Sequence, residues 1–134
     1  MFKSIFAVLT GVVTGFLTIF LVELVAQQVY PVPSEVNLQD PEAMGTYLAS
    51  APMGSLMLVL LAYALGSFLG GMVAARLAKS RKMMHALLVG FLLLLACVAN
   101  FYLLPHPIWF IISSVIIYPL MSFFGGAMGS RDMP

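Results

Sequence analysis

The chain has 134 residues, of which 62% are hydrophobic and only 8% are charged. Soluble domains carry about 25% charged residues, so this composition excludes an ordinary soluble domain. The net charge of +1 provides no basic surface of the kind that binds nucleic acid, and we expect no nucleic-acid partner.

Four apolar runs divide the chain, at about residues 4–27, 52–78, 84–104 and 107–128. Each is near or above the roughly 20 residues that a helix needs to cross a lipid bilayer. The sequence therefore predicts a single all-α membrane domain with four transmembrane helices in a four-helix bundle. The loop 28–51 contains a short predicted helix at about 41–50, with Asp40 as its N-cap and Pro41 at its first position.

The basic residues fall before the first run, between the second and third, or after the fourth. They are Lys3, Arg76, Lys79, Arg81, Lys82 and Arg131. Basic residues gather on the cytoplasmic side of membrane proteins. This pattern places both termini in the cytoplasm and the loop 28–51, with its surface helix, outside.

The first run contains two features of interest. Gly11 and Gly15 form a GxxxG pair, which lets a neighbouring helix approach closely. Glu23 is the only acid within a predicted span, and an ionisable group inside a membrane is a candidate functional site. It lies about one turn from the outer boundary, so a structural or interfacial role competes with the binding of a proton or cation.

Residues 63–76 are nearly repeated at 118–131, with seven of fourteen positions identical. Proline also follows both the first and the third run. We interpret the chain as two hairpin repeats of the same orientation, related by an axis along the membrane normal. The repeat relates Tyr63 to Tyr118, which we expect to face each other or a common axis, either as simple packing or as cavity lining.

Small residues recur along all four runs and predict close helix packing. The glycines are Gly11, Gly15, Gly66, Gly70, Gly71, Gly90, Gly125, Gly126 and Gly129. With the predicted topology they fall in the cytoplasmic half, whereas the outer half holds bulkier residues. This pattern predicts a cavity that opens outward beneath the loop helix. Its candidate lining residues are Glu23, Tyr63, Asn100, Ser114 and Tyr118, although a bridge between helices is the favoured role of Asn100.

Other reactive residues are interpreted as structural. Cys97 is expected to pack within the third span, and predicted topology separates His85 from His106, so they cannot share a metal or haem. The loop acids Glu35, Asp40 and Glu42 match no calcium-loop spacing. No catalytic pairing or phosphate-binding loop is present, so we expect no catalytic residue, metal or cofactor.

Several segments between residues 60 and 127 carry a resemblance to known proteins. They are Ala64-Leu-Gly66 with Gly70, Lys82-Met83, Ala86-Leu87 with Gly90, Ala99-Asn100, Leu104-Pro105-x-Pro107-x-Trp109-Phe110 and Gly125-Gly126. The chain resembles a common group of small bacterial four-helix membrane proteins to which no activity is assigned. The resemblance implies a bacterial inner membrane and transfers no catalytic residue.

The sequence supports two functional hypotheses. The recurrence of small-residue seams on all four helices favours a non-enzymatic accessory subunit, which forms a homo-oligomer or binds a larger membrane protein. The alternative is a small transporter or channel, with Glu23 as the proton or cation site and the two tyrosines near the pseudo-symmetric centre.

Overall fold

The computed structural model describes residues 2–31, 37, 39–50, 53–103 and 107–130. Five helices make up the described chain: α1 (Phe2–Val29), α2 (Pro41–Ser50), α3 (Met53–Leu77), α4 (Lys82–Leu103) and α5 (Ile108–Gly129). The predicted all-α class with four long apolar helices is confirmed. Positions 52 and 104, Glu35, His106 and Arg131 lie outside the described residues.

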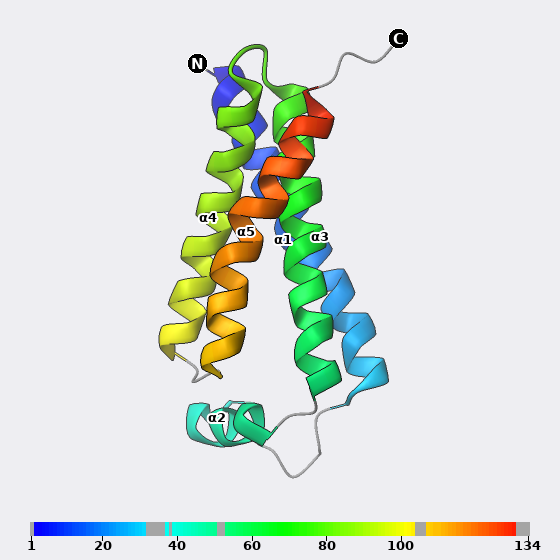
Figure 1. The fold of residues 1–134 in the computed structure, drawn as a ribbon, viewed down its shortest axis with the longest axis vertical. Helices are drawn as coiled ribbons and strands as arrows, with labels where there is room; N and C mark the ends of the chain where they lie inside the picture. The colour runs from blue at the N-terminus through cyan, green and yellow to red at the C-terminus, as the bar shows by residue number, and fades with distance from the viewer. Residues whose placement is uncertain (1, 32–36, 38, 51–52, 104–106, 131–134) are drawn as a thin grey trace.

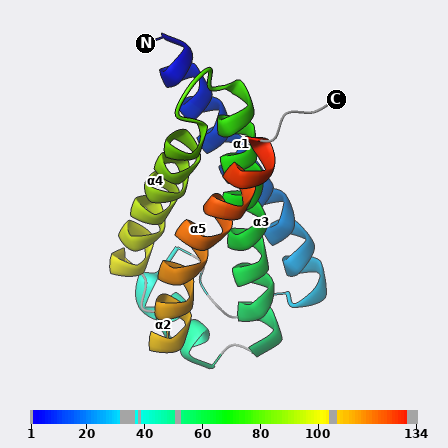
Figure 2. The same cartoon turned by 45° about the horizontal axis from the view of Figure 1, so that its top comes forward.

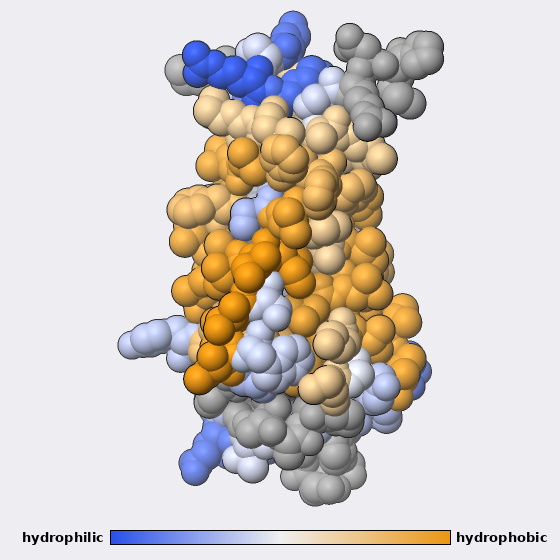
Figure 3. All heavy atoms as spheres, viewed as in Figure 1, coloured by the Kyte–Doolittle hydropathy of each residue, from blue (hydrophilic) through white to orange (hydrophobic). Residues whose placement is uncertain are grey.

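Four of the helices, α1, α3, α4 and α5, are long and apolar enough to cross a membrane. Figure 1 shows them side by side, with α1 and α4 running away from the chain termini and α3 and α5 returning toward them. A broad apolar band separates hydrophilic residues at the two ends in the face drawn in Figure 3. The chain is therefore a multi-pass membrane protein.

The long helices begin or end one or two residues from the predicted boundaries. The hydrophobic pattern shows where the apolar residues begin and end, whereas the ends of a helix are set by its backbone hydrogen bonds. For example, α4 already begins at Lys82, because the carbonyl of Arg81 accepts a hydrogen bond from the backbone N–H of His85 at 3.2 Å. At α2, the Asp40 carboxylate accepts a hydrogen bond from the backbone N–H of Glu42 at 3.1 Å, as expected of an N-cap.

Helix α3 packs against each of the other three spans. Figure 2 gives a second view of this arrangement, with α5 crossing in front of α3. The short helix α2 lies at the end of the bundle opposite the termini, across the direction of the long helices (Figure 1). The basic residues Lys3, Arg76, Lys79, Arg81 and Lys82 belong to the other end, where α1 and α4 begin and α3 finishes.

The glycines named above are all buried and face neighbouring helices of the same chain. Gly11 and Gly15 on α1 meet Gly70 and Gly66 on α3. On another face of α3, Gly71 lies against the backbone of Ser122 on α5. These contacts occupy the half of the bundle that contains the basic residues, and they draw the helix backbones together there.

The interface between α4 and α5 departs from the symmetry that the repeat suggests. Gly126 is the repeat counterpart of Gly71, but it faces Ala86 and Met83 on α4, whereas Gly71 faces α5. Equivalent glycines therefore meet different neighbours in the two halves. The sequence repeat does not carry over into identical contacts at these positions.

Candidate functional site: a cavity beside paired tyrosines

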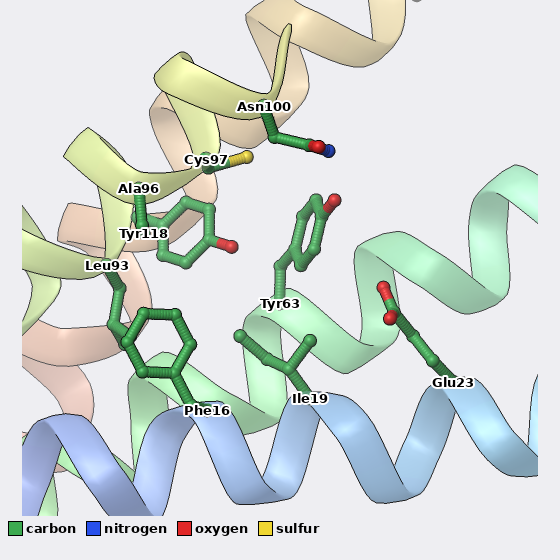
Figure 4. Close-up of a pocket in the computed structure, with 9 residues that line it drawn as sticks. All are labelled: Phe16, Ile19, Glu23, Tyr63, Leu93, Ala96, Cys97, Asn100 and Tyr118. Atoms are coloured by element: carbon green, nitrogen blue, oxygen red, sulfur yellow. The ribbon is translucent and has the colours of Figure 1, made fainter. Parts of the chain in front are cut away.

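A cavity of about 170 Å³ lies among the four long helices, in the part of the bundle between its middle and the α2 end. Figure 4 shows the nine side chains that line it: Phe16, Ile19, Glu23, Tyr63, Leu93, Ala96, Cys97, Asn100 and Tyr118. They come from α1, α3, α4 and α5. Since a bound water needs only about 10–15 Å³ of such space, the cavity has room for several waters or one small solute.

Two tyrosines from different helices form one wall of this cavity. Tyr63 on α3 and Tyr118 on α5 stack with their ring centroids 5.2 Å apart and their planes inclined at 30°. Both rings are buried, Tyr118 being only 2% exposed. In Figure 4 the hydroxyl of Tyr118 points toward Tyr63, and the hydroxyl of Tyr63 points toward Asn100. The pair therefore combines a rigid aromatic surface with two polar atoms.

Aromatic packing fixes the position of Tyr63 from its other side. Its ring makes an edge contact with Phe110, at a centroid distance of 5.9 Å, and Phe110 is fully buried. Phe110 in turn contacts Phe101 and Trp109 at 5.8 and 6.0 Å. These contacts fill the space between α3, α4 and α5 toward the α2 end, so the cavity lies on the α1 side of the tyrosine pair.

Glu23 enters the cavity from α1, and its carboxylate points toward the side of the cavity that Tyr63 occupies (Figure 4). The side chain is partly buried. Within the described residues, no hydrogen bond or ion pair satisfies this carboxylate. A charged carboxylate at the centre of a membrane span costs about 3 kcal/mol on insertion scales, and less toward the end of the span, where Glu23 lies. A proton or a cation would stabilise the carboxylate here.

The polar lining is completed from α4. Asn100 extends from an exposed position toward the tyrosine hydroxyls, and the sulfur of Cys97 lies between Asn100 and Tyr118 in Figure 4. The cavity thus presents amide, hydroxyl, thiol and carboxylate groups to one small volume.

The structure brings together four of the five residues proposed from the sequence: Glu23, Tyr63, Asn100 and Tyr118. Ser114 does not line the cavity. It is fully buried on α5, and its hydroxyl donates to the carbonyl of Phe110 at 2.9 Å, which satisfies the group within its own helix.

Sequence reasoning missed Cys97 as a lining residue and treated it only as packing. A usable signal exists, because Cys97 precedes Asn100 by three positions and therefore shares its face of a helix. The apolar lining residues carry no comparable signal, since Phe16, Ile19 and Leu93 resemble any lipid-facing residue.

The described residues contain no group of three or more His, Cys, Asp or Glu side chains placed to hold a metal ion. The cavity has a single carboxylate, and His85 belongs to the opposite end of α4. The arrangement therefore fits a monovalent or protonated species better than a multidentate metal site.

Comparison of the chain with protein-family models, with curated proteins and with solved structures gives no match.

Proposed function

We propose that this membrane protein binds a proton or a small monovalent cation in the cavity and carries it across the bilayer. The observation that supports the proposal is the Glu23 carboxylate, which has no hydrogen-bond or ion-pair partner among the described residues and lies in a cavity beside two stacked tyrosines. An acid with a purely structural role is normally satisfied by a partner within the protein. Among the described residues, no side chain of the cavity lining supplies such a partner to Glu23. The function is non-enzymatic.

The aromatic lining extends the range of suitable cargo beyond a proton. The faces of Phe16, Tyr63 and Tyr118 border the same volume as the carboxylate. Aromatic faces attract cations, most strongly when water is excluded. Small ammonium-type ions combine positive charge with a size that the cavity accepts, and hydroxyl and amide oxygens of the lining can replace part of the hydration shell of an alkali ion.

The proposed orientation follows from the distribution of charge. Lys3, Arg76, Lys79, Arg81 and Lys82 gather at one end of the bundle, which we assign to the cytoplasmic side of a bacterial inner membrane. The two hairpins then have the same orientation, and both termini are cytoplasmic. In this orientation the glycine contacts close the cytoplasmic half, and the cavity lies nearer the external face.

The accessory-subunit hypothesis stays a prediction, but the structure accounts for the feature that led to it. The small-residue seams meet one another within the chain, as at Gly11 with Gly70 and Gly71 with Ser122. A homo-oligomer or a larger partner would therefore have to use the exposed outer faces of the helices. Native mass spectrometry of gently solubilised protein separates the two hypotheses, because a defined hetero-complex supports the accessory role.

The transport proposal is tested in proteoliposomes that contain a pH-sensitive dye for protons and methylammonium, or a dye selective for sodium or potassium. Imposed gradients of protons, sodium, potassium or methylammonium are expected to produce protein-dependent flux for at least one of these ions. The substitution Glu23→Gln preserves size but removes the charge, and it should lower the flux about ten-fold or more, the loss expected from about 1.4 kcal/mol of ion binding. The matched control is Glu42→Gln, because Glu42 is an exposed carboxylate on α2 outside the cavity.

Binding can be followed separately from flux. Trp109 is the only tryptophan, and its ring contacts Phe110, which contacts Tyr63 in the cavity wall. Methylammonium is expected to change the fluorescence of Trp109 in the parent protein and in Glu42→Gln, with a much weaker response in Glu23→Gln. Equal flux and equal fluorescence responses in the parent and Glu23→Gln proteins would contradict the proposal.

A further inference from the structure

A second and larger hollow, of about 760 Å³, lies at the basic end of the bundle, between the first turns of α1 and α4. It is separate from the Glu23 cavity and shares no lining residue with it. The proposed transport function makes no use of it. Its lining is apolar in the part nearer the middle of the bundle and polar in the part nearer the basic end.

The deeper part of the hollow is an apolar trough. Ile5 and Leu9 are four residues apart on α1, and Met84 and Leu88 are four residues apart on α4, so each pair follows one face of its helix. All four side chains remain substantially exposed, from 43% at Leu88 to 59% at Leu9. Because α1 and α4 run in the same direction, the two rows lie along the path that a lipid acyl chain takes.

The rim of the hollow is polar and positively charged. It is formed by Ser4 on α1 and by Ser80 and Arg81 in the turn before α4. Lys3 and Lys79 are the sequence neighbours of the two serines, and both lysines are exposed. The described acids Glu23, Asp40 and Glu42 all belong to other parts of the fold, so no acidic side chain of the described chain neutralises this rim.

The backbone holds Arg81 in a specific position at this rim. Arg81 has a φ of 51°, a left-handed conformation that residues other than glycine seldom adopt. Its carbonyl accepts hydrogen bonds from the backbone N–H of His85 at 3.2 Å and from Nδ1 of the His85 ring at 2.8 Å. These two bonds fix the backbone while the guanidinium stays exposed. A guanidinium in such a position is suited to a phosphate group, with which it forms paired hydrogen bonds.

We propose that the hollow is a binding site for an anionic phospholipid of the adjoining leaflet. The lipid phosphate lies against Arg81, with Ser4 and Ser80 as hydrogen-bond donors, and one acyl chain lies along Ile5, Leu9 and Leu88. Charge complementarity selects an anionic headgroup, because the rim is cationic and no acid among the described residues neutralises it. The apolar trough selects a lipid over a free phosphate ion, which would leave that surface uncovered.

The test compares lipid binding by native mass spectrometry of the full-length protein in mild detergent. Phosphatidylglycerol and phosphatidylcholine with identical acyl chains serve as the probes, and the parent protein is expected to retain phosphatidylglycerol preferentially. Arg81→Asn removes the charge but keeps a residue that tolerates positive φ. It should weaken phosphatidylglycerol binding about five-fold, the contribution expected of one basic residue near an anionic lipid. Arg76→Gln, which removes an exposed charge at the same end but outside the hollow, should change binding less than two-fold.

Ser4→Glu provides an independent variant, because it places a negative charge at the rim on an exposed residue and leaves the turn intact. It should also lower phosphatidylglycerol binding. The proposal is overturned if the parent protein shows no headgroup preference, or if Arg76→Gln and Arg81→Asn reduce binding equally. Displacement of the lipid by inorganic phosphate or glycerol phosphate at comparable concentrations would overturn it as well, since those ions lack the acyl chain.

Discussion

Gly11 on α1 and Gly70 on α3 touch through their backbones, and the contact is reciprocal. A Cβ atom on either glycine would lie 2.6 Å from the carbonyl oxygen of the other. One turn further along each helix, Gly15 and Gly66 form a second reciprocal pair, with corresponding distances of 3.2 and 2.8 Å. In a bilayer, where lipid is as apolar as a leucine side chain, such close backbone approach is a main source of attraction between helices.

The Gly11–Gly70 contact predicts a large cost for adding a side chain at either position. Gly70→Val places two methyl groups where the α1 backbone lies, and overpacking of this kind costs about 1–3 kcal/mol. We expect a corresponding fall in the free energy of unfolding, measured by titration with sodium dodecyl sulfate from a mild detergent. The control is Ala99→Val, which also creates a valine but at an exposed position on α4, where it adds two methyl groups to an existing Cβ. Equal destabilisation by the two substitutions would show that the backbone contact is unimportant.

Because Tyr63 and Tyr118 are stacked, we expect the ring of Tyr118 to contribute much more than its hydroxyl to the free energy of unfolding. Tyr118→Ala removes a ring that is 2% exposed and stacked on Tyr63, so we expect a loss of about 3–5 kcal/mol in the free energy of unfolding. Tyr118→Phe keeps the ring and removes only a hydroxyl, for which membrane hydrogen bonds suggest a loss of about 0.6 kcal/mol. The same titration measures both variants. A Phe variant as unstable as the Ala variant would assign the stability to the hydroxyl instead of the stack.

The proposed orientation predicts which residues can be labelled from each side of the membrane. In a Cys97→Ser background, cysteines are introduced at Glu42 on α2 and at Ser80 in the turn between α3 and α4, both of which are exposed. A membrane-impermeant maleimide should label Glu42→Cys in intact spheroplasts and Ser80→Cys only after permeabilisation. The reverse pattern would invert the proposed topology and place the Glu23 cavity nearer the cytoplasm.

The helices were the most predictable part of the fold, because each depends on a local signal. The lengths of the apolar runs predicted the four long helices, and the Asp40-Pro41 pair predicted the start of α2, which begins at Pro41. The close packing at Gly11 and Gly70 was also foreseeable as a feature of each helix, since small residues at helical spacing mark a packing face. None of these predictions requires knowledge of the neighbouring helix.

The contacts between helices were less predictable, because they depend on how each helix is rotated about its axis. Sequence spacing could not predict that Gly71 lies against Ser122 on α5. Nor could it predict that its repeat counterpart Gly126 faces Ala86 on α4. It also placed Ser114 in the cavity, although the rotation of α5 directs Tyr118 there and leaves Ser114 bonded to its own helix. Cys97 shares a face of α4 with Asn100, but only the packing of α4 against the tyrosine pair shows that this face lines the cavity.

The position of the glycine contacts also determines how the bundle can move. Glu23 follows Gly11 by twelve residues, a distance of about 18 Å along a helix that rises 1.5 Å per residue. If the contact between Gly11 and Gly70 acts as a pivot, a tilt of α1 by about 10° displaces Glu23 by about 3 Å, roughly the diameter of a water molecule. Helix α1 is then a lever whose shorter arm reaches the basic end and whose longer arm reaches Glu23, so a displacement of the basic end is accompanied by a somewhat larger displacement of the acid.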